Sequence, residues 1–361
     1  MKKVVIAMSG GVDSSVAAYL LKEEGYDVIG ITMQIWQSET HEVVAARGGC
    51  CGMTAVEDAR FVCHKLNIPH YTLNFRNIFR KKVIDYFAEE YKAGKTPNPC
   101  IACNRFVKWQ SLLERALELE ADYIATGHYS RIVRHPDTNR LTIMSSESSK
   151  DQSYALYNLT QEQLERTVFP IGHLQKDELR KIAAQKIGLR VAHKPDSQEI
   201  CFIPDQNHGK FLEEYFGEIL PPGDFVDEAG NILGQHKGIG RYTIGQRKGL
   251  GMSFGQPMYV KEIDAVNNKV VLADDDALFG NYMTVDDINF MSHDAFENKI
   301  HCFGKIRYSH KAAPCVISYS KGIITCTFDK PQRALTPGQS AVFYDEERRI
   351  ICGGTISSQI L

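Results

Sequence analysis

The stretch Val4–Ser15, with the sequence VVIAMSGGVDSS, decides the fold of the first half of the chain. An apolar run leads into the adjacent glycines Gly10 and Gly11, and apolar residues at helical spacing follow over Val16–Lys22. This pattern predicts a strand, a tight turn and a helix. Adjacent glycines let the backbone approach a phosphate closely, and the N–H groups at a helix start attract an anion. The turn is therefore predicted to bind the phosphates of a nucleotide; the alternative is a βα turn that binds no ligand.

The turn matches neither of two common nucleotide-binding motifs. It lacks the Gly-Lys-Ser/Thr of a Walker A loop, and its glycines do not have the G-x-G-x-x-G spacing of dinucleotide folds. The spacing S-G-G-x-D-S-S over Ser9–Ser15 instead resembles the PP-loop of ATP pyrophosphatases. These enzymes cleave ATP between the α and β phosphates and adenylate a substrate, so the resemblance implies an adenine nucleotide alpha-hydrolase-like domain.

The rest of the first half alternates short apolar runs with helical patterns. The predicted strands are Val4–Met8, Asp27–Met33, His70–Asn74 and Asp122–Thr126. The predicted helices are Ser15–Glu24, one that opens at Thr54, Ile78–Ala93 and Phe106–Leu119. Alternating strands and helices predict an α/β fold with a doubly wound parallel sheet, which binds ligands at the carboxyl ends of its strands. The Ser9 turn, Met33 and Gly127 all lie at that edge.

The second half changes character. A hairpin is predicted over 130–146 and helical structure over Thr160–Gly188, and Pro221–Gly223 marks a boundary. Short alternating strands with Gly, Asn and Asp turns follow, which is typical of small β-barrel-type domains. The predicted strands include Met258–Ile263, Lys269–Ala273, His301–Ile306, Val316–Tyr319, Ile323–Phe328 and Ser340–Tyr344. We expect an α/β domain over 1–205, whose portion from about 145 to 205 is helical, a central β-rich domain over 206–280 and a β-barrel over 281–361.

The composition is that of an ordinary globular protein. The 361 residues are 43% hydrophobic and 24% charged, with a formal net charge of −2, which neither indicates nor excludes a nucleic-acid partner. No apolar run reaches the length of a membrane span, and the N-terminus has no signal-peptide pattern, so we expect a cytoplasmic protein without a membrane partner. Ten cysteines in a reducing compartment are not expected to form a disulfide framework.

The second informative motif is Thr96–Asn104, with the sequence TPNPCIACN. Two prolines stiffen a predicted loop just before a helix, and Cys100 and Cys103 have C-x-x-C spacing. A helix N-terminus lowers the pKa of a thiol and favours the thiolate. A redox pair, a metal ligand set and a nucleophile all fit this spacing, as do two cysteines that simply pack in a turn.

Weaker motifs lie further along. Taken singly, Asp196–Ile203 fits a strand that enters the core, Lys150–Tyr154 a solvated loop and Arg241–Gly251 a β-turn. The last of these combines basic residues, an aromatic ring and glycines, which also suits a phosphate backbone. Arg307 and Tyr308, with His310 and Lys311, offer a further cation–aromatic pair.

Together and in this order, these motifs resemble the bacterial tRNA-specific 2-thiouridylases over nearly the whole chain. That family replaces the C2 oxygen of the wobble uridine of tRNA with sulfur. The motifs that carry the resemblance are Ser9–Ser15, Thr96–Asn104, Ala125–Tyr129, Lys150–Tyr154, Ile200–Ile203, Thr243–Gly251, Arg307–Tyr308 and Leu335–Tyr344.

The resemblance implies a role for each matching residue. Residues expected to hold the nucleotide are Ala7, Met8, Ser9, Gly10, Gly11, Val12, Asp13, Ser14, Met33 and Gly127. Residues expected at the target base or on tRNA are Asn98, Pro99, Cys100, Lys150, Asp151, Gln152, Arg307 and Tyr308. Cys103 is the implied nucleophile and Cys201 the implied persulfide carrier, with Asp13 as a candidate to help hold Mg²⁺.

The implied chemistry needs ATP because a carbonyl oxygen is a poor leaving group. Adenylation bonds the uridine C2 oxygen to the α-phosphorus of ATP as pyrophosphate departs, so that this oxygen can later leave as part of AMP, and Mg²⁺ neutralises the phosphate charge. Sulfur then displaces AMP. It reaches Cys201 from a donor protein, either a cysteine desulfurase or a sulfur relay carrier, and a Cys103–Cys201 disulfide forms that a reductant resets.

Cys100 departs from the family pattern, in which Asp is common at this position. The departure gives Cys100, Cys103 and Cys201 as a set of three thiolates, which suits a 4Fe–4S cluster whose remaining iron binds hydrosulfide. Sulfur delivery therefore has two alternatives at this stage, a persulfide on Cys201 or a cluster held by all three cysteines. A structural zinc lacks a fourth ligand.

The remaining cysteines are expected to be less informative. Cys50 and Cys51 fit a helix-entry turn with incidental thiols, or a sulfur relay. Cys63 is predicted on the buried face of a helix, and Cys302, Cys315, Cys326 and Cys352 are predicted to pack in β-structure. His128 follows the end of a predicted strand, where it either contacts the nucleotide or has only a structural role.

Two competing functions remain open from the sequence. One is another PP-loop enzyme, a synthetase or amidase that acts on a small molecule, which would not need paired thiols. The other is a tRNA-binding protein with a vestigial nucleotide fold, which would release no pyrophosphate. The cysteine set argues against the first, and the intact Ser9–Ser15 turn with Cys103 argues against the second.

Overall fold

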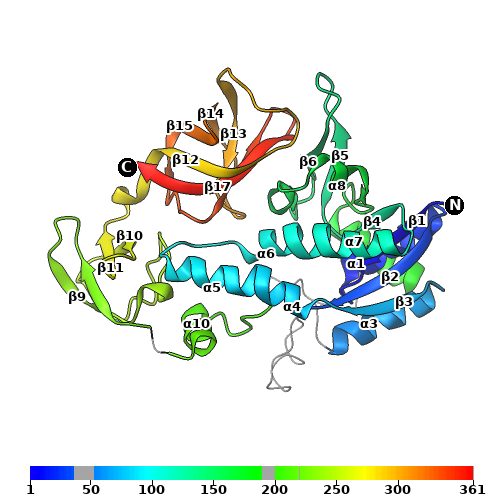
Figure 1. Ribbon diagram of the computed structural model, residues 1–361, viewed down its shortest axis with the longest axis horizontal. Coiled ribbons are helices and arrows are strands. Elements are labelled where there is room, and N and C mark those ends of the chain that lie inside the picture. The colour runs from blue at the N-terminus through cyan, green and yellow to red at the C-terminus, as the bar shows by residue number, and fades with distance from the viewer. Residues whose placement is uncertain (36–52, 189–199, 219, 361) are drawn as a thin grey trace. The chain divides into compact units, whose positions relative to one another are not determined.

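The computed structural model describes residues 1–35, 53–188, 200–218 and 220–360 (Figure 1). The chain forms two compact units. Unit 1 contains residues 1–83, 100–204 and 347–350, and unit 2 contains residues 84–99, 205–346 and 351–361. The predicted nucleotide-binding turn lies in unit 1, and most of the predicted β-rich part lies in unit 2.

Unit 1 is built on a parallel sheet of five strands in the order β3-β2-β1-β4-β7. The strands are β1 (Lys3–Ala7), β2 (Asp27–Gln34), β3 (His70–Asn74), β4 (Tyr123–Ala125) and β7 (Thr167–Val168). Val4, Val5 and Ile6 of the central strand β1 are fully buried. A strand buried on both faces reads as a continuous apolar run, which is why β1 was predictable from sequence.

Helices cover both faces of this sheet. Alternate residues of β1 pack on α1 (Val12–Glu23), α3 (Met53–Lys65) and α9 (Lys176–Ile182) in one apolar core. Figure 1 shows the helix that ends in α7 (Leu113–Glu118) on the side of the sheet opposite α3. The predicted doubly wound α/β fold is therefore confirmed.

The predicted helix Phe106–Leu119 was wrong at its start. The observed helix begins seven residues earlier with α6 (Pro99–Ala102), continues as a π-helix, η2 (Cys103–Leu112), and ends as α7. Proline is well tolerated in the first turn because the first N–H groups of a helix have no intrahelical partner. Cys100 and Cys103 thus lie within the helix and not in a loop before it.

Two other helical predictions differ from the structure. The predicted helix Ile78–Ala93 is a succession of α4 (Arg76–Phe79), a π-helical turn η1 (Arg80–Ile84) and α5 (Asp85–Lys92). The predicted helical segment Thr160–Gly188 contains the strand β7, because the β-branched Thr167 and Val168 pair with β4. On either side of β7 lie α8 (Gln161–Glu165) and α9, and the π-helical turn η4 (Ala183–Ile187) follows α9.

The hairpin predicted over 130–146 is confirmed as β5 (Ser130–Arg134) and β6 (Leu141–Ser145). A short 3₁₀ helix, η3 (Ser153–Leu156), follows it. Among the described residues, no helix is long and apolar enough to cross a membrane.

Unit 2 begins its β-structure after α10 (His208–Phe216). A four-stranded sheet in the order β10-β11-β8-β9 contains β8 (Gly223–Val226), β9 (Ile232–His236), β10 (Tyr259–Asp264) and β11 (Lys269–Ala273). The short 3₁₀ helices η6 (Ile239–Arg241) and η7 (Asp276–Leu278) lie within and just after this sheet in the chain.

The last strands close into a barrel in the order β12-β15-β14-β13-β16-β17. They are β12 (Phe279–Phe290), β13 (Ile300–Lys305), β14 (Ala313–Ser320), β15 (Ile323–Arg333), β16 (Ser340–Tyr344) and β17 (Ile350–Ile360). The predicted C-terminal β-barrel is confirmed. Its apolar interior includes Cys302, Cys315, Cys326 and Cys352, so these cysteines pack in the core as expected.

Candidate active site

The two-glycine turn after β1 has the geometry expected of a phosphate-binding loop. Gly10 has φ +68°, and a Cβ on it would lie 2.4 Å from the carbonyl oxygen of Ala55. Ser15 Oγ donates to the carbonyl oxygen of Gly11 at 2.7 Å, and Ser14 Oγ does so at 3.2 Å. These hydroxyl contacts fix the turn at the N-terminus of α1, where backbone N–H groups favour an anion.

The end of β4 packs directly on this loop. A Cβ on Gly127 would lie 2.8 Å from the backbone carbon of Asp13 and 2.8 Å from the nitrogen of Ser14. Any side chain at position 127 would therefore displace the loop. Met33, the other residue predicted at this edge, is half-buried in β2.

Asp13 has an ion-pair partner, Lys176, that was not predicted from the sequence. Lys176 Nζ lies 2.8 Å from Asp13 Oδ1 and 3.1 Å from Oδ2, and the Tyr129 hydroxyl donates to Oδ1 at 2.9 Å. Tyr129 is held in turn by Gln152, whose side-chain oxygen accepts from the Tyr129 N–H at 3.1 Å. Lys176 is the first residue of α9, where a cation opposes the helix dipole. That unfavourable position is the signal that could have identified it.

The three cysteines of the predicted sulfur chemistry all lie in unit 1, and none is deeply buried. Cys100 and Cys201 are exposed, and Cys103 is half-buried at the start of η2. Cys201 lies in a turn closed by a hydrogen bond from the Ile203 N–H to the Ile200 carbonyl at 2.9 Å. The next residue, Phe202, is buried with its ring 5.8 Å from that of Phe79, which anchors the turn.

The described residues contain no group of three or more Cys, His, Asp or Glu side chains placed to hold a metal ion. In this arrangement Cys100, Cys103 and Cys201 therefore do not form a three-thiolate set, and an iron–sulfur cluster does not fit them as they stand. Cys50 and Cys51 lie outside the described residues.

A second polar group links the cysteine helix to the end of β4. Lys108 Nζ in η2 donates to Asn104 Oδ1 at 2.8 Å and lies 3.5 Å from His128 Nε2. The other ring nitrogen of His128 lies 2.6 Å from Thr126 Oγ1. Burial and the neighbouring Lys108 cation hold the pKa of His128 well below its usual range, so the ring is neutral.

The residues predicted to contact tRNA have internal partners as well. Asp151 accepts hydrogen bonds from the Ser146 N–H at 2.9 Å and from Ser153 Oγ at 2.8 Å. Arg307 donates to the Ala334 carbonyl at 3.2 Å, and Tyr308 is 48% exposed. Lys150 and Asn98 are half-buried, and Pro99 is buried. Their roles toward tRNA stay predictions.

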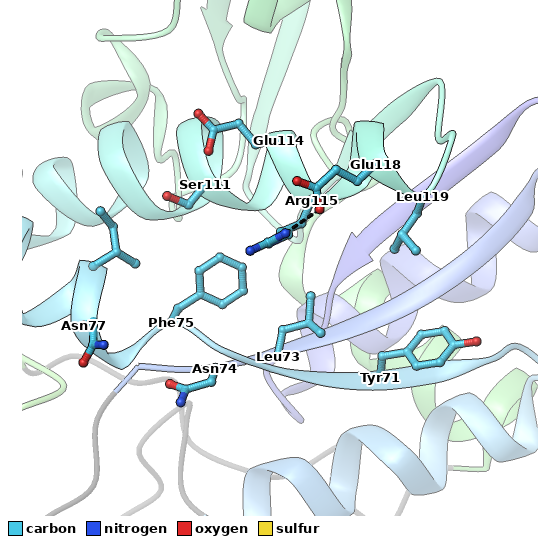
Figure 2. Close-up of a pocket in the computed structure, with 11 residues that line it drawn as sticks. Tyr71, Leu73, Asn74, Phe75, Asn77, Ser111, Glu114, Arg115, Glu118 and Leu119 are labelled. Carbon is cyan, nitrogen blue, oxygen red and sulfur yellow. Dashed lines mark hydrogen bonds and ion pairs between the residues drawn. The ribbon is translucent and has the colours of Figure 1, made fainter.

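Unit 1 also contains a cavity of about 690 Å³ beside the edge strand β3 (Figure 2). Its lining includes Tyr71, Leu73 and Phe75, and across from them an exposed ion pair of Arg115 with Glu118 at 2.5 Å. None of the residues predicted to act on nucleotide, base or sulfur lines it. The reaction is therefore better placed at the carboxyl edge of the sheet than in this cavity.

The fold and the loop define the class of the protein. A parallel sheet whose first strand runs through an S-G-G-x-D-S-S turn into a helix makes unit 1 an adenine-nucleotide-binding domain of the PP-loop ATP pyrophosphatase type. Residues 2–205 match the family described as tRNA methyl transferase HUP domain. Residues 209–274 match its PRC-barrel domain, and residues 281–356 match the aminomethyltransferase beta-barrel domain.

The relatives are similar over the whole chain. A protein of Lachnoclostridium phytofermentans named tRNA-specific 2-thiouridylase MnmA is 56% identical and covers 99% of both chains. Proteins of the same name from Acetivibrio thermocellus and Clostridium beijerinckii are each 54% identical, over 98% and 100% of this chain and 99% of their own. The chain belongs to the tRNA-specific 2-thiouridylase family, which confirms the resemblance drawn from its motifs.

Proposed function

We propose that this protein is an ATP-dependent tRNA-uridine 2-sulfurtransferase that makes 2-thiouridine at the wobble position. The observation that carries the proposal is the presence, in one unit of a member of this family, of an intact phosphate loop and three accessible cysteines. A synthetase or amidase of the PP-loop type needs the loop but has no use for the thiols. The proposed substrate implies a cytoplasmic location.

The first half-reaction uses the phosphate loop. The residues from Ser9 to Ser14 receive the ATP phosphates, and the uridine O2 attacks the α-phosphorus as pyrophosphate leaves. Mg²⁺, when bound, neutralises the phosphate charge. Asp13 would help to hold Mg²⁺, and because both of its carboxylate oxygens contact Lys176, part of that ion pair would have to open.

The second half-reaction uses the cysteines. A sulfur donor protein, a desulfurase or a relay carrier, leaves a persulfide on Cys201, and its terminal sulfur attacks C2 of the adenylated uridine as AMP departs. The Cys103 thiolate then attacks Cys201 Sγ, which releases the sulfur on uridine and forms a Cys103–Cys201 disulfide. A dithiol reductant returns the two electrons and restores both thiols.

The proposal extends to the organisation of the chain. The domain over 1–205 adenylates the base and delivers sulfur, with Lys150, Asp151 and Gln152 in its helical portion near the RNA. The domains over 206–280 and 281–361 hold tRNA, with Arg307 and Tyr308 on the latter. Because phosphate contacts dominate such binding, raising the salt concentration is expected to weaken tRNA affinity steeply.

The experiment that tests the function is a reaction of ATP, unmodified tRNA, and a cysteine desulfurase with free cysteine as the sulfur source, with the purified protein. Formation of 2-thiouridine with one AMP and one pyrophosphate per base supports the proposal, and AMP without thiolated tRNA contradicts it. Iron and acid-labile sulfide counted on anaerobically purified protein decide the route. About four irons per chain that are lost in Cys100→Ala would replace the persulfide on Cys201 with a cluster.

A further inference from the structure

Within the described part of the chain, Lys108 is a cation that no carboxylate pairs with. Its Nζ contacts Asn104 Oδ1 at 2.8 Å and His128 Nε2 at 3.5 Å, and no carboxylate of the described residues lies within 4.0 Å of it. Lys176, by contrast, is held by both oxygens of Asp13. Asp13 thus neutralises the charge of Lys176, whereas no carboxylate of the described residues neutralises that of Lys108.

The neighbours of Lys108 are fixed in a neutral state. An ammonium can only donate, so His128 Nε2 accepts from Lys108, and Nδ1 must then carry the ring proton and donate to Thr126 Oγ1. The His128 ring is buried against Trp109 and Phe169. Two neutral acceptors orient the ammonium without reducing its charge, which is the arrangement expected of an anion-binding group.

The position of Lys108 identifies the anion. In a π-helix the residues i and i+5 are joined by a backbone hydrogen bond, so Lys108 lies one turn beyond Cys103 on η2. On its other side His128 directly follows Gly127, which packs on the backbone of Asp13 and Ser14. Lys108 therefore connects the helix that carries the thiol with the loop that receives the phosphates.

We propose that Lys108 binds a non-bridging oxygen of the α-phosphoryl group during the reaction, an inference that rests on the proposed function. This group takes part in both half-reactions. In the first, an O–P bond forms from uridine O2, the bond to pyrophosphate breaks, and the N3 proton is lost to solvent. In the second, a C–S bond forms, the C2–O bond breaks, AMP leaves with the electron pair, and N3 regains its proton.

An ammonium aimed at the α-phosphoryl group stabilises the charge that develops in both steps. Removing one such preorganised group typically lowers the rate about 10²–10³-fold. We expect Lys108→Met to lower pyrophosphate release with tRNA by that factor, and Lys108→Arg to retain part of the rate because the charge is kept. Lys65→Met is the matched control, since Lys65 also donates to neutral oxygens, those of Ile187 and Gly188.

The assay compares pyrophosphate release, 2-thiouridine formation and melting temperature for the wild type and these three variants. A second readout uses the two diastereomers of ATP with sulfur on the α-phosphorus. If Lys108 binds one non-bridging oxygen, the rate difference between the diastereomers shrinks in Lys108→Met, which a merely structural lysine would not cause.

Two outcomes would overturn the inference: wild-type pyrophosphate release by a folded Lys108→Met, or an unchanged diastereomer ratio in that variant. Either result leaves the proposed function intact as long as the wild type makes 2-thiouridine. Failure of the wild type itself to adenylate or thiolate tRNA would instead contradict the proposed function.

Discussion

The same side chain, cysteine, is used in opposite ways in two regions of this molecule. Cys100, Cys103 and Cys201 in unit 1 are exposed or half-buried, whereas the four cysteines inside the barrel of unit 2 are at most 5% exposed. A thiol reacts as the thiolate, and burial in apolar surroundings disfavours that form. Solvent access therefore separates the cysteines that can carry sulfur from those that fill a core.

The barrel cysteines are close enough to affect one another. Cys302 and Cys315 face each other across β13 and β14, with their sulfur atoms 3.6 Å apart. The hydrogen bond with Cys315 raises the pKa of Cys302, and burial adds to this effect. The same two causes raise the pKa of Cys326, and burial, with a smaller contribution from the charge of Cys315, raises that of Cys352. Cys302, Cys326 and Cys352 therefore stay protonated at neutral pH, whereas the hydrogen bonds with Cys302 and Cys326 lower the pKa of Cys315.

The largest expected difference between the two regions is in activity. Cys103→Ala and Cys201→Ala are each expected to lower 2-thiouridine formation about 10³-fold or more, because each removes a sulfur that takes part in bond making. Cys326→Ala, which removes a buried thiol of the barrel, should keep the wild-type rate within about twofold at a temperature where the variant is folded. The measurement is the initial rate of tRNA thiolation with a cysteine desulfurase and free cysteine as the source of persulfide sulfur.

The adenylation step sharpens this test. Cys103→Ala should still release pyrophosphate, since the phosphate loop from Ser9 to Ser14 is untouched. A Cys201→Ala protein that thiolates tRNA at the wild-type rate would remove the persulfide scheme, and a barrel variant as inactive as Cys103→Ala would remove the distinction between the two regions.

The next difference is in chemical reactivity. Iodoacetamide should modify Cys100 and Cys201 in the native protein, whereas Cys302 and Cys352 react only after the barrel opens. Opening of a stable core costs about 5 kcal/mol or more, which corresponds to protection of about 10³-fold or more. Mass spectrometry of peptides after timed labelling measures each rate. Equal labelling of Cys352 and Cys201 in native protein would contradict the assignment.

The contrast between the two regions could be predicted in part from the sequence. The apolar run before Ser9, the glycine pair and the alternation of strands and helices gave the doubly wound sheet, because strands buried on both faces have a continuous apolar pattern. The barrel cysteines stood in alternating β patterns and were predicted to be core. What failed was the start of the cysteine helix, where the prolines of Thr96–Asn104 indicated a loop and the helix begins at Pro99.

The polar side chains of the site were the least predictable part. In sequence Lys176 carries only the weak signal of a cation at a helix start and Lys108 carries none. Their importance comes from contacts with Asp13 and His128, which are separated from them along the chain. Contacts between distant segments depend on how the sheet orders its strands, and a one-dimensional pattern does not contain that information. The motif residue Gln152, expected to contact tRNA, is also the hydrogen-bond partner that holds Tyr129.

A smaller effect concerns stability. Cys326→Ser places a hydroxyl in the apolar barrel core, and we expect it to lower the free energy of unfolding by about 1–3 kcal/mol. Cys201→Ser changes an exposed side chain and should alter it by less than about 0.5 kcal/mol. Urea denaturation followed by fluorescence gives both values. A Cys201→Ser protein destabilised as much as Cys326→Ser would show that Cys201 is packed and not exposed.

The smallest expected effect is in the pH dependence of stability, and it separates the regions without relying on activity. Burial raises the pKa of the Cys352 thiol in the folded protein, while the unfolded thiol titrates near its usual value of about 8.5. Above that pH the unfolded chain loses a proton that the native chain keeps, so each buried thiol lowers the free energy of unfolding by up to about 1.4 kcal/mol per pH unit. The contribution of the protonated thiol to stability is fully present below pH 8.5 and is lost as the pH rises.

The free energy of unfolding of Cys352→Ala should therefore decline less steeply than that of the wild type between pH 8.5 and 10 in urea titrations, whereas that of Cys201→Ala should follow the wild-type slope. Parallel slopes for Cys352→Ala and the wild type would mean that this thiol ionises inside the barrel, and the division into reactive and inert cysteines would then have to rest on access alone.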